Sequence, residues 1–337
     1  MHDTDEAYQT HILQGVSRTF ALTIPQLPPH LCKVVGNAYL LCRIADTIED
    51  EPILTIEQKQ YFSDAFIQVV AGEISPQNFA HELVPLLSDA TSVDEKDLIQ
   101  NTPRVIHLTH NFTEIQQAAL YRCVQIMAHG MADFQRNASP HGLKDLKAMD
   151  DYCYYVAGVV GEMLTDLFCD YSPEIDKNRE QLQKLAISFG QGLQMTNILK
   201  DIWEDLERGV CWLPRDIFQQ VGFDLSNLSP DIYDEKFGNG LEKLIGIAHK
   251  HLYNSLSYVL LIPSLEKGIR RFCLWALGMA ILTLRKINTH REFKTGQHVK
   301  ISRRSVKATI ISTNLATRSD FTLKTLFYIL TRNLPKK

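Results

Sequence analysis

Long stretches without proline are the feature that most constrains the fold of this 337-residue chain. These stretches cover residues 30–51, 104–139, 141–172, 174–213 and 264–334. Because proline is excluded from helix interiors and tolerated in turns, this spacing favours long helices. Apolar residues recur at steps of three and four within them, for example at Leu31, Val34, Val35, Ala38, Leu41, Cys42 and Ala45. No sustained period-two alternation interrupts them. The pattern predicts a single all-α domain over residues 1–337, with shorter pieces between residues 72 and 112.

Composition and charge narrow the class of protein. Hydrophobic residues make up 45 % of the chain, which is enough for a sizeable core. The formal net charge of -4 argues against general nucleic-acid binding, which requires a basic domain. Seven cysteines are scattered without a CxxC pair, so we expect free thiols in a reducing compartment.

The chain offers no obvious targeting or spanning segment. Its first ten residues are acidic and polar, unlike a secretory signal. The apolar run from Phe321 to Leu330 is too short and too polar to span a bilayer. We expect a cytoplasmic protein without a transmembrane anchor, and leave open peripheral contact with the inner face of the membrane.

Two acidic clusters carry the clearest chemical signal. Asp46, Glu49 and Asp50 end one apolar-periodic stretch, and an identical spacing ends another at Asp201, Glu204 and Asp205. In a helix, residues at i, i+3 and i+4 share one face, where like charges repel unless a cation neutralises them. Oxygen-only ligands at this density suit a hard divalent cation, Mg²⁺ in particular, with Mn²⁺ as a substitute.

Polar residues upstream of both clusters extend the same faces. Tyr39 and Arg43 precede Asp46, and Gln194 and Asn197 precede Asp201, each at helical spacing. The alternative for one acidic cluster alone is a solvated helix end. Two copies with polar residues in register, predicted to point inward, favour a functional site.

Two facing acidic helices would bind a diphosphate through bridging metal ions. Neutralised diphosphate is a good leaving group, and its departure leaves an allylic cation. The rest of the pocket must then be apolar, so that water does not quench the cation.

Further segments carry a resemblance to a known family. They are Ser17-Arg18-Thr19-Phe20, the helix segment HGMADF at 129–134, YCYYVAGVVG at 152–161, QMTNILKD at 194–201 and FKTGQHVKISRR at 293–304. Together with the two acidic clusters, they resemble the squalene and phytoene synthase family, most closely its squalene-forming branch. The likeness extends from about Ser17 to about Thr309.

The resemblance implies a helical isoprenoid-synthase bundle around a deep apolar cavity, and a two-step reaction. Two farnesyl diphosphates would condense head to head to presqualene diphosphate, which NADPH would reduce to squalene for sterol or hopanoid biosynthesis. Tyr155 would manage the proton of the first step, although a buried tyrosine with a satisfied hydroxyl is the plain alternative.

The resemblance also assigns binding residues. It places Ser17, Arg18, Phe20, Tyr39, Arg43, Gln194, Asn197 and Lys200 at the substrate, and Asn197 with the two acidic clusters at the metal. Lys200 stands where the family usually has arginine, and so lacks the bidentate fork for phosphate. Gly158 and Gly161 would allow close helix packing or leave room for a prenyl chain. Phe272 would either wall the second-step cavity or belong to the core.

A basic segment near the C-terminal end of this likeness is a candidate to bind the cofactor of the reducing step. Residues 285–307 hold eight lysines and arginines but one acid, Glu292. Lys300, Arg303 and Arg304 are candidates to bind the NADPH phosphates. The alternative is a basic surface that touches anionic lipid.

Several functions compete with reductive condensation. Dehydrosqualene and phytoene synthases share the first step and need no reductant. A non-catalytic member of the family is expected to have eroded acidic clusters, and both are intact here. Head-to-tail elongating enzymes carry DDxxD motifs, which DTIED and DIWED are not. Nothing in the sequence requires a protein partner.

Overall fold

The computed structural model describes residues 4–17 and 19–336, and within them the chain forms two compact units. Unit 1 comprises residues 1–136 and 162–177, and unit 2 comprises residues 137–161 and 178–337. The predicted single domain stays a prediction.

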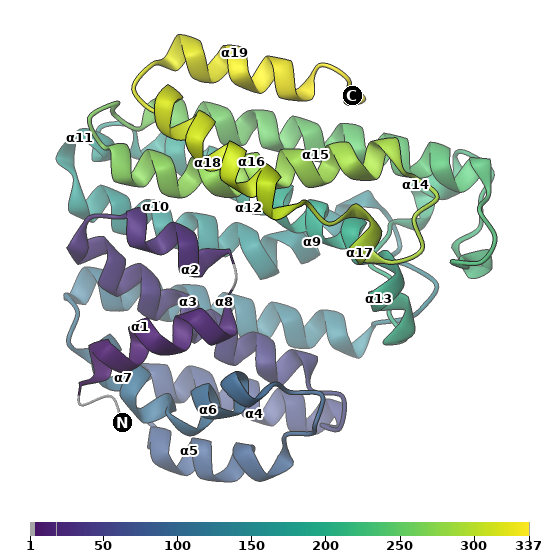
Figure 1. Cartoon of the computed structure of the whole chain (residues 1–337). Coiled ribbons are helices and arrows are strands. Elements are labelled where there is room, and N and C mark those ends of the chain that lie inside the picture. Colours follow the sequence, from purple (N-terminus) through teal and green to yellow (C-terminus); the bar gives the residue numbers. More distant parts are fainter. Residues whose placement is uncertain (1–3, 18, 337) are drawn as a thin grey trace. The chain divides into compact units, whose positions relative to one another are not determined.

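Unit 1 contains the N-terminal helices and a later helical segment (Figure 1). Its elements are α1 (Asp5–Val16), α2 (Phe20–Thr23), η1 (Ile24–Gln26), α3 (Pro29–Asp50), α4 (Ile56–Ala71), α5 (Pro76–Leu83), η2 (Val84–Leu86), α6 (Val93–Gln100), α7 (Thr102–His110), α8 (Glu114–Arg136), most of α10 (Val159–Tyr171) and α11 (Pro173–Asp176).

Unit 2 contains the C-terminal helices and the segment before α10. Its elements are α9 (Leu146–Cys153), the π-helical turn η3 (Tyr154–Gly158), α12 (Arg179–Lys200), α13 (Ile202–Glu207), α14 (Arg215–Gln219), η4 (Leu225–Asn227), α15 (Glu235–Leu261), α16 (Lys267–Thr289), α17 (Gly296–Val299), α18 (Arg303–Ala316) and α19 (Asp320–Thr331).

The predicted all-α class is confirmed. Residues 4–17 and 19–336 form no strand, and their one β-bridge is an isolated contact between Leu143 and Pro214. Each long proline-free stretch carries at least one long helix, and residues 72–112 break into short helices as expected.

Caps and apolar faces explain the helices of unit 1. The Thr55 hydroxyl oxygen accepts from the Gln58 backbone amide, and the Gln58 side-chain oxygen accepts from the Thr55 backbone amide. This capping box starts α4. Gly72 ends α4 in the left-handed region, at φ 81°. The buried face of α3, which includes Leu40, Leu41 and Ile44, packs against α8. The residues of α3 outside this buried face are the ones that are free of the α8 contact and could form a site.

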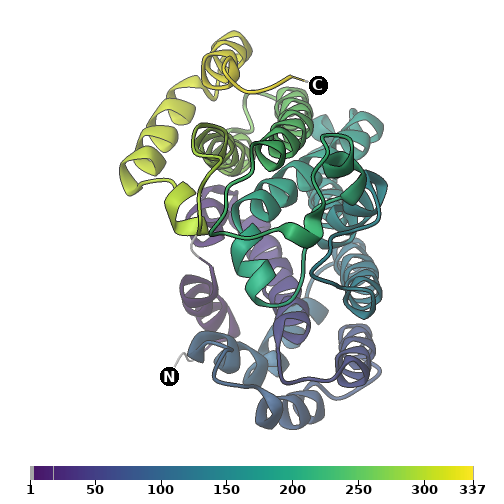
Figure 2. The same cartoon turned by 90° about the vertical axis from the view of Figure 1, so that its right-hand side faces the viewer.

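Unit 2 is built around α12, which packs against α15, α16 and η3. Glycines permit the closest approach: a Cβ on Gly190 would lie 2.1 Å from the Ala157 carbonyl oxygen, and one on Gly161 would lie 2.3 Å from that of Ala186. Of the two predicted roles for Gly161, close helix packing is therefore the one observed. Figures 1 and 2 show α18 and α19 on the outer side of α16 and α15.

All seven cysteines are free thiols, as predicted. Across the described part of the chain, no helix combines the length and apolar character that crossing a bilayer demands.

Candidate active site

The first acidic cluster lies at the C-terminal end of α3. Asp46 and Glu49 are half-buried there, while Asp50 is the last residue of the helix and is exposed. Burial, with a further contribution from the Asp50 charge, raises the pKa of Asp46 to about 7 and that of Glu49 to about 8. Burial therefore favours the protonated form of both carboxyl groups, and a bound cation would favour their charged form.

Arg43 links this cluster to α6. Its guanidinium forms an ion pair with Glu95 and lies 3.8 Å from an Asp46 oxygen. Glu95 also accepts from the Ser92 amide and hydroxyl in the capping box of α6. Burial opposes ionisation of Glu95, but the hydrogen bonds from Ser92 and the Arg43 charge lower its pKa. Arg43 is therefore held between two carboxylates.

The predicted substrate residues near the N-terminus join the same face of α3. The Tyr39 hydroxyl donates to the Val16 carbonyl oxygen at 3.0 Å, and its ring contacts that of Phe20. The Ser17 hydroxyl accepts from the Phe20 amide at 3.0 Å. Ser17 and Phe20 therefore lie beside Tyr39, whose pKa is raised by burial. Arg18 lies outside the described residues.

Gln135 was not predicted, yet it binds this cluster. Its side-chain amide donates to Glu49 Oε1 at 2.9 Å from the last turn of α8. The sequence signal was its position directly after the HGMADF segment, 129–134. Glu95 was also missed, because S-V-D-E at 92–95 indicates a helix cap and nothing more.

The second acidic cluster departs from the predicted geometry. Asp201 does not lie within one helix with Glu204 and Asp205, because α12 ends at Lys200 and α13 begins at Ile202. The Asp201 backbone, at φ -101° and ψ 18°, forms the junction. The Asp205 amide still donates to the Asp201 carbonyl at 2.9 Å, so near-helical spacing survives the break.

Each carboxylate of this cluster has its own contact. Lys200 Nζ lies 2.9 Å from Asp201 Oδ2, so here the lysine pairs with its neighbour. Burial raises the pKa of Asp201, although the Lys200 charge lowers it in part. Asp205 is buried and pairs with Arg208 at 2.5 Å.

Gly296 brings the basic C-terminal segment onto the second cluster. Its amide donates to Glu204 Oε1 at 2.7 Å. A Cβ at Gly296 would lie 3.1 Å from Asp201 Oδ1, from Glu204 Oε1 and from the Lys200 carbonyl oxygen. The Trp203 ring amine donates to the Phe293 carbonyl at 2.7 Å and holds the same segment. A side chain here would crowd these oxygens, so glycine favours the close approach. The sequence shows this signal only as one glycine in FKTGQHV.

The residues upstream of the second cluster agree only in part with prediction. Gln194 is half-buried on α12, but Asn197 is exposed and does not point into the core of unit 2 as expected. The buried face of α12 packs against α15, so the polar residues Gln194 and Asn197 lie outside this contact.

Tyr155 lies in η3, a single π-helical turn. Such turns cost helix stability and are common at functional sites. The Tyr155 ring contacts that of Tyr154 at 5.4 Å, and Tyr152 stacks on Trp212 at 4.0 Å. The three neighbouring tyrosines therefore have different surroundings: Tyr152 is buried, whereas Tyr154 and Tyr155 are half-buried.

The candidate cofactor residues are all accessible. Lys300, Arg303 and Arg304 are exposed, and the two arginines occupy the first turn of α18. Partial positive charge at a helix N-terminus adds to theirs and favours an anion. By contrast Phe272 is buried in α16, so the choice between a cavity wall and the core stays a prediction.

Metal binding rests on the chemistry of the donors. Within residues 4–17 and 19–336, no group of three His, Cys, Asp or Glu side chains has converged around a metal position. The donors are nevertheless all oxygen, and Glu204 Oε2 is buried without a hydrogen-bond partner. Together with the raised pKa values of Asp46 and Glu49, this fits Mg²⁺ held by a few carboxylates with water and phosphate. The two clusters belong to different units, and their facing arrangement stays a prediction.

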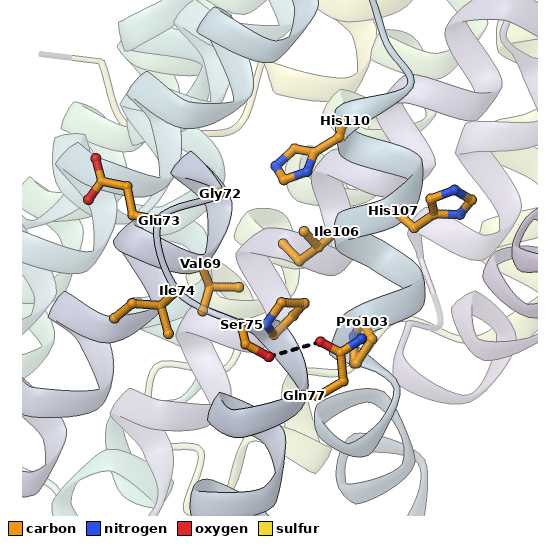
Figure 3. Close-up of a pocket in the computed structure, with 11 residues that line it drawn as sticks. Val69, Gly72, Glu73, Ile74, Ser75, Gln77, Pro103, Ile106, His107 and His110 are labelled. Atoms are coloured by element: carbon orange, nitrogen blue, oxygen red, sulfur yellow. Dashed lines mark hydrogen bonds between the residues drawn. The ribbon is translucent and has the colours of Figure 1, made fainter.

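A cavity of about 390 Å³ opens in unit 1 on the turn between α4 and α5 (Figure 3). Its rim includes His107, whose ring contacts Asp5 at 2.6 Å, and His110, whose ring contacts the Val70 carbonyl at 3.2 Å. None of the predicted site residues lines it. The predicted deep apolar cavity is therefore a different feature, and stays a prediction.

Comparison with known proteins identifies the family of this chain. The family model for squalene/phytoene synthase matches residues 13–305, which include both acidic clusters, Tyr155 and the basic segment up to Arg304. The chain belongs to the squalene/phytoene synthase family. This confirms the family inferred from the motifs.

Individual members of the family are similar over most of this chain. The squalene synthase of Cyberlindnera jadinii is 29 % identical over 318 residues, which cover 91 % of this chain and 66 % of that enzyme. The chain thus spans just under two thirds of the length of that relative.

Solved structures share the fold. TcSQS in complex with the ligand BPH1237 superposes with a TM-score of 0.77 at 24 % identity, covering 98 % of this chain and 92 % of that one. A dehydrosqualene synthase in complex with a ligand has a TM-score of 0.67 at 20 % identity, covering 94 % and 97 %. The all-helical isoprenoid-synthase fold is therefore shared.

Proposed function

We propose that this protein condenses two farnesyl diphosphates head to head and then reduces the product to squalene with NADPH. The observation that carries the proposal is the first cluster: burial raises the pKa of Asp46 and of Glu49 on the face of α3 that also presents Tyr39 and Arg43, and a bound cation would favour their ionised form. An anionic substrate with its metal ions is the partner that such a face needs. The family match over residues 13–305 supports the same reading.

In the proposed reaction, Asp46, Glu49 and Asp50 would hold metal ions from α3, and Asp201, Glu204 and Asp205 would hold them from the α12–α13 junction. Bound Mg²⁺ would neutralise the diphosphate and so make it a better leaving group. Arg43 and Lys200 supply further positive charge toward phosphate oxygens. Ser17 and Phe20 would help to hold one diphosphate beside Tyr39, and the family resemblance adds Arg18 to this set. Gln194 and Asn197 would contribute polar groups from α12.

Tyr155 is the proposed proton-handling residue of the condensation. Ring closure to the cyclopropyl diphosphate requires loss of one proton from the substrate carbon, and the tyrosine oxygen can accept it as its own hydroxyl proton passes to an acceptor such as the departing diphosphate. The π-helical turn that carries Tyr155 supports this role, because the turn displaces its side chain from a regular helical face.

Lys300, Arg303 and Arg304 are the proposed contacts for the NADPH phosphates. Support comes from the Gly296 amide, which fastens the preceding segment to Glu204 and so keeps the basic residues near the second cluster. The first turn of α18 adds free amide groups and two guanidinium groups that favour phosphate.

The test is product identification. The purified chain is incubated with farnesyl diphosphate and Mg²⁺, with and without NADPH, and the lipids are separated by mass. We expect squalene with NADPH and accumulation of presqualene diphosphate without it. The absence of any C30 product under both conditions would refute the proposal.

A second candidate is dehydrosqualene synthesis, in which the last cation loses a proton in place of gaining a hydride. The fold similarity to a dehydrosqualene synthase supports this second candidate. The triple change of Lys300, Arg303 and Arg304 to Gln separates the two. Reductive synthesis predicts a steep rise in the NADPH requirement with near-normal condensation, since each charge-assisted hydrogen bond contributes roughly 1.5–3 kcal/mol. Dehydrosqualene synthesis predicts unchanged C30 output.

A further inference from the structure

The outward faces of α18 and α19 in unit 2 expose a row of large apolar side chains. Ile311 and Leu315 lie one turn apart on α18, and Phe321, Tyr328 and Ile329 share the outer side of α19. Their exposed fractions range from 51 % for Ile329 to 81 % for Leu315. We call these five residues, with the cations between them, the α18–α19 surface. Clustered exposure on this scale marks a contact surface more often than isolated exposed residues do.

This exposure does not come from a poorly seated helix. The inner side of α19 buries Leu323 and Phe327, and the Phe327 ring contacts those of His249 and Tyr253 on α15. The two helices therefore pack on α15 and α16 through their inner faces, and the apolar side chains on their outer faces are exposed. Figure 2 shows both helices at the edge of unit 2.

A buried arginine fixes the turn that joins them. Arg270 is 1 % exposed and donates to the carbonyl oxygens of Ile262 and Thr317 at 2.6–3.0 Å. It also forms an ion pair with Asp320 at 2.8 Å. The relative placement of α18 and α19 is thus set by a buried charge with several acceptors.

The charge around the apolar row is one-sided. Lys307, Arg318, Lys324, Arg332 and Lys336 are all exposed. Asp320 is the one acidic residue between positions 303 and 336, and Arg270 already neutralises it. This contrasts with the chain as a whole, whose formal net charge is -4. The surface therefore combines apolar side chains with positive charge on an otherwise acidic protein.

We infer that the α18–α19 surface docks on an anionic lipid bilayer. The lysines and arginines would meet lipid phosphates, while Phe321, Tyr328 and the aliphatic side chains enter the headgroup boundary. Neither helix crosses the bilayer; each lies along it. A symmetric second copy fits poorly, because a self-complementary contact would bring the same cations together. The inference does not depend on the proposed reaction, and it leaves Lys300, Arg303 and Arg304 to the cofactor.

The experiment is vesicle flotation of the full chain with either phosphatidylcholine alone or an equimolar mixture with phosphatidylglycerol. The wild-type protein is expected to float with the anionic vesicles, to do so less at high salt, and to stay behind with phosphatidylcholine alone. Phe321→Ser with Ile329→Ser should weaken partitioning at least about tenfold. Changing Arg318, Lys324 and Arg332 to Gln should cost about fivefold for each charge removed.

Matched controls separate the surface from general exposure and from misfolding. Val93 and Ile232 are 83 % and 76 % exposed elsewhere on the chain, so Val93→Ser and Ile232→Ser should float like the wild type. Leu315→Ser, on α18, provides a surface variant that leaves α19 intact, and thermal unfolding checks each fold.

Three results would overturn the inference. They are no flotation of the wild type with anionic vesicles, flotation unchanged by all the surface variants, and a dimer in light scattering that Phe321→Ser with Ile329→Ser dissociates. The last result would assign the surface to a second copy of the chain. Prenyl transfer can be assayed separately in detergent, so failure of docking and failure of the proposed reaction are distinguishable.

Discussion

Asp46 and Glu49 are the carboxyl groups of the first acidic cluster whose pKa values are raised by burial. Their pKa values in the folded protein, about 7 and about 8, lie above the ordinary values of 3.8 and 4.5. The folded state thus binds protons more tightly than the unfolded state, so these groups disfavour folding increasingly as pH rises from about 4 through about 8.

These raised pKa values predict that the stability of the folded protein falls as pH rises. Without Mg²⁺, the melting temperature should decline between pH 5 and pH 8, and Asp46→Asn with Glu49→Gln should flatten that decline because neither amide titrates. Saturating Mg²⁺ and diphosphate should raise the melting temperature of the wild type at pH 8 but should leave that of the double variant unchanged. An identical pH profile in wild type and variant would show that these carboxylates are not strained by their surroundings.

The exposed Asp50 and the junction residue Asp201 test the two clusters separately. Asp50→Asn and Asp201→Asn should each reduce turnover by several orders of magnitude while circular dichroism stays unchanged, because each change removes a proposed metal-binding charge, one from the end of α3 and one from the α12–α13 junction. Steady-state kinetics across a Mg²⁺ titration measures the effect. Near-normal activity in either variant would remove that cluster from the site.

Tyr155 is tested by removing one oxygen atom. Tyr155→Phe should lower formation of the cyclopropyl intermediate by about two orders of magnitude or more, as expected for a group that moves a proton. Stability should change by no more than about 1 kcal/mol, the net contribution of an ordinary hydrogen bond. Preserved activity with a large fall in melting temperature would assign the hydroxyl to the core instead. Tyr154→Phe, one residue away, is the matched control.

At the scale of helices and loops, the contact between α17 and the α12–α13 junction connects the acidic and basic parts of unit 2. The Gly296 amide reaches Glu204, and three oxygens crowd the position that a Cβ would occupy. This contact explains why Glu204 is oriented before any ligand arrives.

Gly296→Ala should therefore weaken the use of Mg²⁺ and of NADPH together. The new methyl group must displace Glu204 or the segment itself by a few tenths of an ångström. We expect the concentrations of Mg²⁺ and of NADPH needed for half-maximal rate both to rise several-fold, with little change in the helical content. Thr295→Ala, one residue earlier and exposed, is the control. Unchanged requirements for both would show that this contact has no role in the reaction.

Sequence patterns predicted the elements more fully than the contacts between them. Proline spacing and apolar periodicity are local properties, so α3, α8, α12 and α16 followed from them. The break at Asp201 did not, because D-I-W-E-D continues a helical pattern and the interruption arises where the 293–299 segment packs on it. Gln135, Glu95 and Gly296 were missed for a similar reason: their roles depend on residues more than 50 positions away.

At the scale of the whole molecule, the family match accounts for the order of motifs from residue 13 to residue 305. It does not distinguish reduction from proton loss, since relatives of both kinds share the fold. The exposed Lys300, Arg303 and Arg304, which we propose as contacts for NADPH, are the residues through which this chain would use the cofactor. The source of the last hydrogen in the product therefore decides the central claim.

That hydrogen can be followed directly with NADPH carrying deuterium at the transferable position. The purified chain, farnesyl diphosphate and Mg²⁺ are incubated with the labelled cofactor, and the C30 hydrocarbon is analysed by mass spectrometry. Reductive head-to-head synthesis predicts squalene heavier by one mass unit than the product made with unlabelled NADPH. An unlabelled C30 product, formed at the same rate with or without the cofactor, would contradict it.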